Sequence, residues 1–214
     1  GGREAINELY GPYNMHFVGA HVGGQESLNS SKPLNGIEDL KAFKFRSPPG
    51  METEIFQSLG ASPIVMDFTE IFTALETGII DGADASTLAV NTSLGIYDIA
   101  KHTTDTGFQT MSTDQLSSRT DVWESLSPAH QRIIETAHKK QMADYVMVTM
   151  VENGEALAKM PEMGVTIYDW SAEDRAAFRE AAKGAWDEWA KKTPEAAEMV
   201  ESHKSFLKRI GLSN

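Results

Sequence analysis

Side chains that could bind a small anion gather in one short stretch, FKFRSPPG, at residues 43–50. Apolar and basic residues alternate there, so a strand would place Phe43 and Phe45 on one face and Lys44 and Arg46 on the other. The prolines that follow cannot continue a strand ladder, which places Arg46 at the carboxyl end beside the start of a helix. A guanidinium there can bind a carboxylate through two parallel hydrogen bonds. The same pattern also fits a solvated arginine on an edge strand.

A second candidate site is DGADAS, residues 81–86, which ends a predicted isoleucine-rich strand at 78–82. Its two carboxylates, Asp81 and Asp84, lack the spacing of a calcium-binding loop. In the plainest interpretation this is a turn in which Asp81 caps the following segment. Ligands of open α/β sheets bind beyond the carboxyl ends of strands, however, so Asp84 remains a candidate ligand-binding residue.

Other signatures of chemistry are absent or weak. The sequence contains no GxSxG, GxxxxGK[ST], GxGxxG or HExxH motif, which lowers the expectation of an enzyme. Six histidines without metal-ligand spacing are interpreted as surface residues or satisfied structural residues: His16, His21, His102, His130, His138 and His203. Zero cysteines exclude disulfides and thiolate metal sites.

Composition indicates a globular protein. The 214 residues are 41% hydrophobic and 23% charged, which is ordinary for a folded domain. The net charge of −12 argues against nucleic acid as a partner, because phosphate binding requires clustered Lys and Arg. No run of about 18 apolar residues predicts a membrane span. An anionic ligand would therefore need a local cation such as Arg46.

The first half of the chain alternates between predicted strands and predicted helices. Strands are expected at residues 14–20, 43–47, 64–66 and 78–82, and helices at 50–59, 69–77 and 88–99. Thr69 is the expected N-cap of the second helix, and Asn91 on the third is interpreted as solvated. Strands separated by such helices predict βαβ units and a parallel or mixed sheet.

The second half is mostly helical. Residues 127–128, a serine N-cap and a first-turn proline, open a long helix that is expected to run to about Met160. Residues 145–151 are apolar on all sides of that helix and are predicted to be buried between layers. A strand at 165–168 and helices opening at Ser171 and Pro194 follow. Trp186 and Trp189 stand at helical spacing and are expected to pack against the rest of the fold.

Two longer segments resemble the solute receptors of tripartite ATP-independent periplasmic (TRAP) transporters, the DctP-like proteins. DLKAFKFRSPPG (39–50) and LGASPIVMDFTEIFTALETGIIDGAD (59–84) are similar to the family motifs DLKGLKxRxP and LGAxPxxMxxxExYxALxxGxxDGxE. The resemblance runs from residue 1 to about residue 127. It implies an α/β, periplasmic binding protein-like (type II) fold of two lobes with long connecting helices, which closes over an organic anion.

The resemblance also assigns roles to individual residues. The family arginine falls on Arg46 and would pair with the ligand carboxylate. The loop HVGGQ resembles a subgroup that binds 2-oxo acids and hydroxy acids, in which Gln25 and Asp84 would contribute to the ligand and to a bound cation, sodium or calcium. Phe68 matches a pocket aromatic of other branches, although it fits a core aromatic equally well. Gln115, on a predicted polar strand at 109–118, is a further candidate for ligand binding.

One departure leaves the ligand open. Asp84-Ala85 stands where the 2-oxo acid subgroup has Glu-Trp, so the carboxylate is one methylene shorter and an aromatic wall is lost. This puts the cation in doubt, and no other cofactor is expected. Together with Phe68, the departure makes the chain resemble a mixture of branches.

The resemblance also implies a division of the chain. Residues 1–23 are expected to end lobe one and form the hinge, 24–111 to form lobe two, 112–151 to return into lobe one with the long helix, and 152–214 to complete lobe two and add the C-terminal helices. Family members carry a further amino-terminal segment, so the sequence is expected to be a fragment that lacks the N-terminal part of lobe one.

The expected function is that of a periplasmic solute-binding protein rather than an enzyme. It would capture a small organic carboxylate, such as a 2-oxo acid or hydroxy acid, and deliver it to the membrane permease subunits of a TRAP transporter without inserting into the membrane itself. Two alternatives remain at this point: a ligand-sensing ectodomain, and a metal-dependent enzyme that acts on a hydroxy acid through Asp81 and Asp84.

Overall fold

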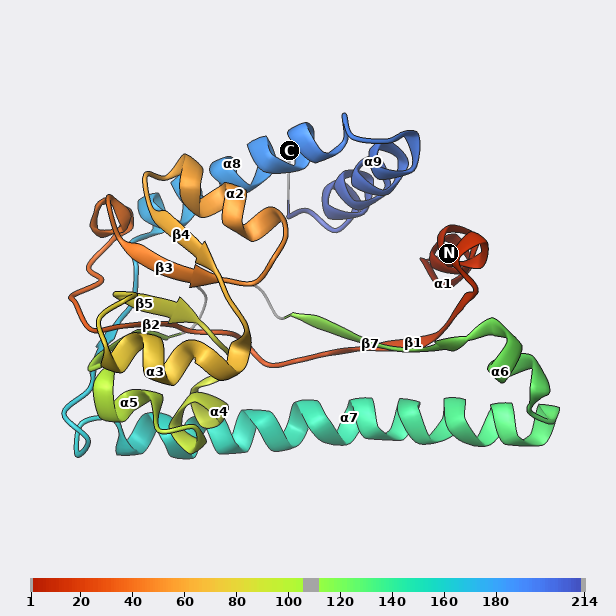
Figure 1. The fold of residues 1–214 in the computed structure, drawn as a ribbon, viewed down its shortest axis with the longest axis horizontal. Coiled ribbons are helices and arrows are strands. Elements are labelled where there is room, and N and C mark those ends of the chain that lie inside the picture. Colours follow the sequence, from red (N-terminus) through yellow and green to blue (C-terminus); the bar gives the residue numbers. More distant parts are fainter. Residues whose placement is uncertain (1, 106–111, 213–214) are drawn as a thin grey trace.

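The computed structural model describes residues 2–105 and 112–212 (Figure 1). Its strands are β1 (Met15–Val22), β2 (Leu28–Ser30), β3 (Lys44–Ser47), β4 (Ser62–Val65), β5 (Gly82–Asp84), β6 (His102–Thr104), β7 (Thr113–Arg119) and β8 (Thr166–Tyr168). Its α-helices are α1 (Gly2–Tyr10), α2 (Met51–Ser58), α3 (Ile71–Glu76), α4 (Leu88–Ser93), α5 (Ile96–Ile99), α6 (Thr120–Ser125), α7 (Pro128–Lys159), α8 (Ala172–Trp189) and α9 (Pro194–Arg209). Short 3₁₀ turns are η1 (Gly11–Tyr13), η2 (Ile37–Leu40) and η3 (Phe68–Glu70).

A six-stranded sheet carries the candidate residues, with the strand order β4-β3-β5-β2-β6-β8. β3 is parallel to both β4 and β5, and β6 is parallel to β8, whereas β2 runs antiparallel to β5 and β6. The predicted mixed sheet with βαβ units is therefore confirmed. Its parallel part, β4-β3-β5, brings the carboxyl ends of these three strands to one edge.

Helices cover both faces of this sheet (Figure 1). On one face, α2 and α8 cover an aromatic core in which Phe43, Phe45 and Phe56 are almost fully buried. On the other face, α3 and α5 pack through Ile71 and Ile96. The predicted alternation of residues 43–46 is confirmed, because both phenylalanines lie in the aromatic core while Lys44 is exposed.

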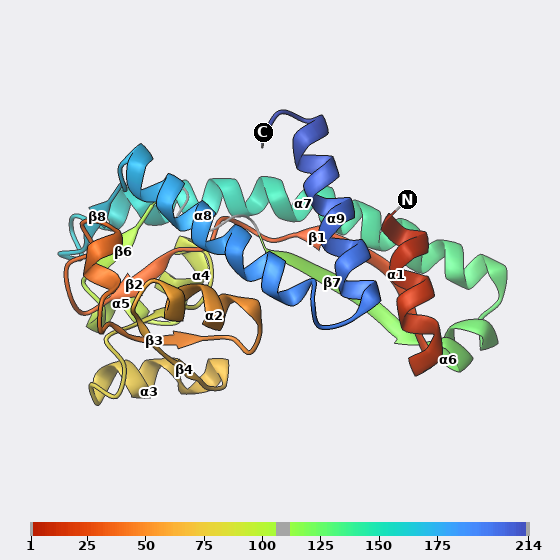
Figure 2. The same cartoon turned by 90° about the horizontal axis from the view of Figure 1, so that it is seen from above.

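A separate two-stranded ribbon, β1 with β7, runs beside the long helix α7 (Figure 2). The 32-residue α7 begins at its Ser127 N-cap, as predicted, and its carboxyl-terminal part packs on α4. Of the predicted strand at 109–118, residues 109–111 lie outside the described chain and residues 113–118 belong to β7. The division into lobes stays a prediction.

Exposure along α7 contradicts one prediction. Within residues 145–151, expected to be buried, Met147 is 70% exposed and Met150 is 71% exposed, while Thr149 is buried. One side of α7 contacts β1, and in the described chain this leaves most of the apolar run on the surface. An all-apolar helix turn predicted burial on every side, but only one side has a partner here.

Three local predictions fail for capping and packing reasons. The N-cap before α3 is Asp67, not Thr69, because Asp67 and Glu70 form a reciprocal capping box. The predicted helix at 88–99 divides into α4 and α5 at a glycine, Gly95, whose φ is 71°. Asn91 is fully buried rather than solvated, and its Nδ2 donates to the Ser86 carbonyl oxygen at 2.8 Å.

No helix in residues 2–105 and 112–212 combines the length and the apolar character that crossing a membrane requires.

Candidate functional site

Arg46 is held at the carboxyl end of β3 by the backbone of two neighbouring segments. Its Nη1 donates to the carbonyl oxygen of Asp84 at 2.8 Å, and its Nε donates to that of Met66 at 3.3 Å. Because β3 lies between β4 and β5 and Arg46 is only 7% exposed, it is not a solvated arginine on an edge strand. Among the described residues Arg46 has no ion pair, and its Nη2 donates no hydrogen bond. This guanidinium is both buried and available to an anion.

Phe68 forms an apolar wall beside Arg46. The guanidinium carbon lies 5.9 Å from the centre of the Phe68 ring, within cation–π range. Phe68 begins η3, where the Asp67 capping box fixes the backbone, and its side chain is 38% exposed. An exposed ring is not a core aromatic, so of the two interpretations left open by the sequence the wall fits the structure.

Asp84 ends β5 next to Arg46 and carries a buried carboxyl group. Its side chain is 4% exposed, and its Oδ1 has no hydrogen-bond partner within the described chain. Burial raises the pKa of Asp84 well above its ordinary value, the carboxyl groups of Glu52 and Glu26 raise it further, and Arg46 acts in the opposite direction. The ionised form of Asp84 is therefore costly unless more positive charge stands beside it.

Glu26 and Glu52, which the sequence reasoning missed, complete a carboxyl cluster with Asp84. Glu26 lies between β1 and β2, and its side chain hydrogen-bonds with Ser112 and Asp84. Burial raises the pKa of Glu26, although those two hydrogen bonds oppose the shift. Glu52 lies in the first turn of α2 and hydrogen-bonds with Asp84. An acid in a first helical turn is commonplace, so Glu52 carries no signal in the sequence.

Asp81 lies at the opposite end of β5 from the carboxyl cluster. Its carboxylate pairs with Lys32 Nζ at 2.8 Å and accepts from the Lys44 backbone N–H at 3.0 Å. Burial acts to raise the pKa of Asp81, but these two lysines outweigh it and the pKa is lowered. The N-cap of the next helix, α4, is Thr87, so the prediction that Asp81 caps the following segment is wrong. Asp81 also cannot form a metal site with Asp84 across the strand, which counts against the hydroxy-acid enzyme.

The two glutamines lie apart from Arg46. Gln25 lines a hollow of about 200 Å³ between the loop after β1, α4 and α7, where Asp105 and Asn153 are its polar neighbours. Gln115 lies on β7, is exposed, and accepts a hydrogen bond from the Tyr10 hydroxyl at 2.8 Å. No contact in the described chain joins either side chain to Arg46. Their roles in ligand binding stay predictions.

His138 differs from what the sequence suggested. It is buried under β1 and its Nε2 has no hydrogen-bond partner within the described residues, so it is neither a surface residue nor a satisfied one. The ring occupies space that a Cβ at Gly19 would need. Close packing against a glycine in β1 explains this burial, and no pattern in the sequence indicates that the two residues meet.

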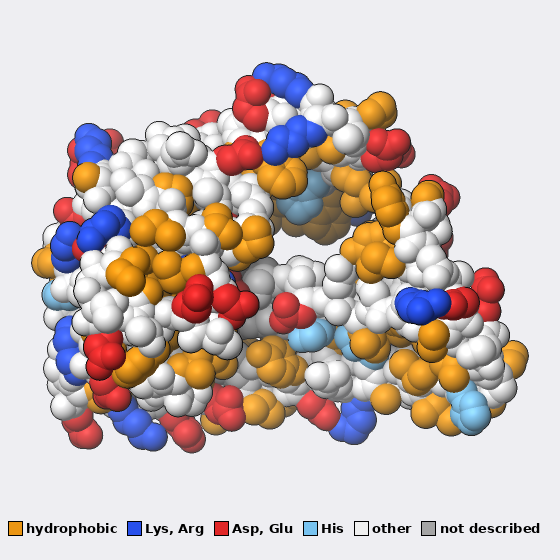
Figure 3. All heavy atoms as spheres, viewed as in Figure 1, with side chains coloured by type: hydrophobic (Ala, Val, Ile, Leu, Met, Phe, Trp, Pro, Cys, Tyr) orange, Lys and Arg blue, Asp and Glu red, His pale blue; other side chains and the backbone are white. Residues whose placement is uncertain are grey.

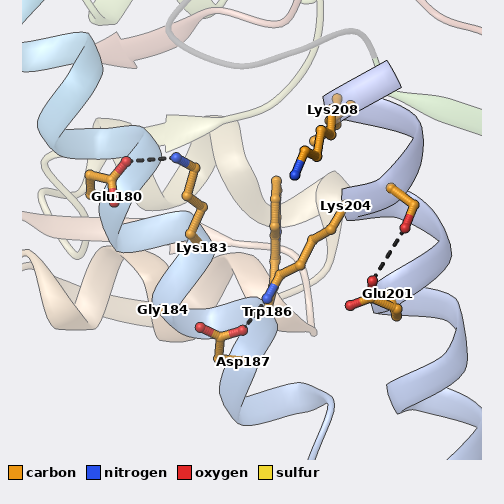
Figure 4. A pocket seen from close by; sticks show the side chains of 10 residues that line it. Glu180, Lys183, Gly184, Trp186, Asp187, Glu201, Lys204 and Lys208 are labelled. Carbon is orange, nitrogen blue, oxygen red and sulfur yellow. Dashed lines mark hydrogen bonds and ion pairs between the residues drawn. The ribbon is translucent and has the colours of Figure 1, made fainter. Parts of the chain in front are cut away.

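A groove of about 580 Å³ lies between α8 and α9, and its lining residues come from these two helices (Figure 4). Trp186 lines it, and two of its lysines are already paired, Lys183 with Glu180 and Lys204 with Asp187. Trp189 packs as predicted, and its Nε1 donates to Glu54 of α2 at 2.8 Å. No strand end opens into this groove, so Arg46 remains the better candidate for binding an anion.

The carboxyl ends of β3, β4 and β5 point toward a hollow face of the molecule. The space-filling view shows this hollow between the sheet, α9 and the β1–β7 ribbon, with acidic side chains on its sheet-side rim (Figure 3). No group of three or more His, Cys, Asp or Glu side chains in the described parts is arranged to hold a metal ion. The arrangement suits a small organic ligand with a carboxylate at Arg46.

The chain is similar to known bacterial solute-binding proteins. A family model described as "Bacterial extracellular solute-binding protein, family 7" matches residues 3–193. The C4-dicarboxylate-binding periplasmic protein of Rhodobacter capsulatus is 31% identical over 176 residues, which cover 79% of this chain and 51% of that protein. The monocarboxylate 2-oxoacid-binding periplasmic protein of Nostoc is 27% identical over 214 residues, which cover 98% of this chain and 58% of that protein. The chain therefore spans little more than half the length of these relatives.

A solved structure supports the fold class. The apo, open form of a TRAP periplasmic solute-binding protein from Rhodobacter sphaeroides superposes with a TM-score of 0.78 at 35% identity, covering 100% of this chain and 68% of that one. The two-lobed periplasmic-binding-protein fold expected from the sequence is confirmed by this likeness. The matched family consists of solute-binding proteins of TRAP transporters, not enzymes. The chain belongs to family 7 of the bacterial extracellular solute-binding proteins.

Proposed function

We propose that this chain is the ligand-capturing part of a periplasmic receptor that binds a small organic carboxylate at Arg46. The receptor would deliver the ligand to the permease subunits of a TRAP transporter, driven by an ion gradient. The observation that carries the proposal is the burial of Arg46 without an ion pair in the described chain. A buried charge is costly unless it is paired, and a ligand carboxylate would supply the partner.

Names of relatives support the same class of ligand. The Rhodobacter and Nostoc proteins are named for C4-dicarboxylates and for 2-oxoacids, both of which carry a carboxylate. Phe68 would contribute apolar contact beside the bound carboxylate, and closure of a second lobe would remove water and strengthen the Arg46 pairing. A sodium or calcium ion at Gln25 and Asp84 stays a prediction, which the experiment below also tests.

The proposal is tested by a thermal-shift screen of organic acids, including succinate, L-malate, pyruvate, L-lactate and D-glucuronate, with calcium or with EDTA. A ligand that binds only the folded protein raises its Tm. The best ligand is then measured by calorimetry against Arg46→Ala and Arg46→Lys. We expect Arg46→Ala to weaken binding by about 100-fold or more, because hydrogen bonds to charged groups are strong. Arg46→Lys keeps the charge but loses the planar fork, so partial binding is expected.

Arg132→Ala is the matched control, because Arg132 is exposed on α7 and has no ion pair in the described chain. It should bind as the wild type does. Full binding by the folded Arg46→Ala variant would contradict the proposal, as would a screen in which no carboxylate raises the Tm. If EDTA abolishes the shift, the prediction of a calcium ion is supported; if EDTA changes nothing, calcium is excluded, and replacing sodium by choline in the buffer then decides the prediction of a sodium ion.

A further inference from the structure

The charge around Arg46 is unbalanced. One guanidinium stands beside the carboxyl cluster of Glu26, Glu52 and Asp84. Glu26 and Glu52 both act on the third, buried acid, Asp84, and the only cation among the causes acting on it is Arg46. A simple monoanion bound at Arg46 would add a fourth acidic group to this region. Like charges in a low-dielectric site repel, so a ligand that also carries a positive charge complements this cluster better than a purely anionic ligand does.

Two side chains in this region each have one atom without a hydrogen-bond partner in the described chain, and the two missing partners are of opposite kinds. Arg46, 7% exposed, has an Nη2 without a hydrogen-bond acceptor in the described chain. Asp84, 4% exposed, has an Oδ1 without a hydrogen-bond donor there. Oδ1 of Asp84 is fully buried, and such atoms are almost always paired, so it points to a ligand group. Nη2 of Arg46 is not among the fully buried atoms that lack a partner in the described chain, so it remains accessible to a ligand group. Nη2 requires an acceptor, and Oδ1 requires a donor.

The missing acceptor and the missing donor lie close together. Nη1 of Arg46 donates to the backbone carbonyl of Asp84 at 2.8 Å, so the guanidinium stands within one residue of the Asp84 carboxyl group. A ligand that meets both needs its carboxylate and its donor only a few bonds apart. Amino acids and related small zwitterions have this arrangement.

We propose that the ligand of this site is a small zwitterion, whose carboxylate binds Arg46 and whose positively charged nitrogen binds Asp84 within the carboxyl cluster. This inference rests on the proposed function, and it narrows the ligand from organic carboxylates in general to those with a nearby ammonium or amidinium group. The cation of the ligand neutralises the acids at the same time as its carboxylate neutralises the arginine. Asp84 is then the residue that selects ligands with a positively charged nitrogen.

A bound proton is the competing explanation for the unpaired Oδ1. A protonated Asp84 would donate to a 2-oxo or hydroxy group, and such a ligand would bind more tightly as the pH falls. A ligand ammonium requires ionised Asp84, so its binding should strengthen as the pH rises. The charged groups that face Asp84 in either case are Arg46, Glu26 and Glu52, and Asp114 acts on Glu26.

The test uses matched sets of ligands that differ in one group. Each set shares a carbon frame and carries an amino, hydroxy or oxo group at C2: L-alanine, L-lactate and pyruvate; L-2-aminobutanoate, L-2-hydroxybutanoate and 2-oxobutanoate; L-glutamate, L-2-hydroxyglutarate and 2-oxoglutarate. Calorimetry at pH 7.5 gives the Kd of each. We expect an amino member to bind at least about tenfold more tightly than its hydroxy and oxo partners, since a charge-assisted hydrogen bond is gained. Its Kd should fall as the pH rises.

Asp84→Asn separates selectivity from binding in general. The amide keeps the shape but cannot neutralise an ammonium, so the preference for the amino member should fall about tenfold or more while Arg46 remains intact. Glu76→Gln is the control, because Glu76 is exposed on α3 and the same charge is removed. It should leave the preference unchanged.

The outcomes distinguish this inference from the proposed function. If hydroxy or oxo members bind and depend on Arg46 while the amino members do not bind, the zwitterion inference is wrong and the carboxylate receptor stands. If Asp84→Asn retains the full amino preference, the role given to Asp84 is wrong. If no member of any set binds the wild-type protein, the inference falls, and the wider acid screen then decides the proposed function alone.

Discussion

At the scale of single residues, Asp84 is the group whose ionisation most affects the molecule. Burial raises its pKa, with Glu52 and Glu26 adding to the shift, so the folded protein holds a proton at Asp84 more tightly than the unfolded chain does. Stability is then lost as the pH rises above the unfolded pKa of about 3.9 and through the raised folded pKa. In the ligand-free protein, the buried Asp84 carboxyl group therefore lowers the free energy of unfolding at neutral pH.

Asp84→Asn should therefore stabilise the ligand-free protein at pH 7.5 by roughly 1–3 kcal/mol. At pH 4, where Asp84 is protonated in the folded state, the gain should shrink or disappear. Urea unfolding at both pH values measures it, with Glu76→Gln as the exposed control. If Asp84→Asn changes the free energy of unfolding equally at both pH values, the surroundings of Asp84 do not raise its pKa, and the prediction is wrong.

At the scale of elements, β5 positions the site because it lies between β3 and β2. Gly82 in β5 has no room for a side chain, since a Cβ there would overlap the Asn29 carbonyl oxygen and the Phe43 ring. This close approach fixes the register between β5 and β3, in which Arg46 lies opposite Ala83. The glycine is thus required by packing, and its φ is not the reason.

Gly82→Ala should destabilise the protein by roughly 1–3 kcal/mol, because overpacking a sheet forces backbone to move. Gly154→Ala is the opposite case: it lies in α7 with no atom within 4 Å of its Cβ position. That substitution should stabilise by roughly 0.5–1 kcal/mol through helix propensity. Thermal unfolding of the two variants measures both changes in stability, the expected loss and the expected gain. A Gly82→Ala variant as stable as the wild type would contradict the packing described for β5.

At the scale of the whole molecule, α7 spans the length of the described fold, about 48 Å at 1.5 Å per residue, and joins the ribbon to the six-stranded sheet (Figure 2). Its middle differs in environment from its carboxyl end. Met147 and Met150 are largely exposed, whereas Met160, just after the helix, is fully buried in the core with Tyr97 and Val165. Methionines in α7 and directly after it therefore contribute differently to stability.

The double substitution Met147→Gln with Met150→Gln should change the free energy of unfolding by less than about 0.5 kcal/mol, because neither side chain is buried. Met160→Gln should cost roughly 2 kcal/mol or more, since it places an amide in the core. Urea unfolding compares the two. A large loss from the exposed pair would mean that these methionines are covered in solution, and light scattering would then reveal a second copy.

Local features of the sequence predicted much of the fold. Ser127 opens α7, and Ser171 opens α8 by accepting from the Asp174 N–H at 3.0 Å, because caps depend on residues only a few positions apart. One error was local: Asp67, not Thr69, is the cap, through its capping box with Glu70. The other arose where distant partners decide: β5 covers Gly82–Asp84 rather than 78–82, because pairing with β3 and β2 fixes its bounds.

The sequence by itself determined that Arg46 ends a strand, since alternation and two prolines are local facts. Only the tertiary structure decided that Arg46 is buried and that Asp84, Glu26 and Glu52 meet beside it. These acids come from β5, from the loop after β1 and from α2, and no spacing in the chain encodes their meeting. Burial and charge coupling are properties of packed neighbours, so the charge imbalance on which the zwitterion proposal rests exists only once the sheet has formed.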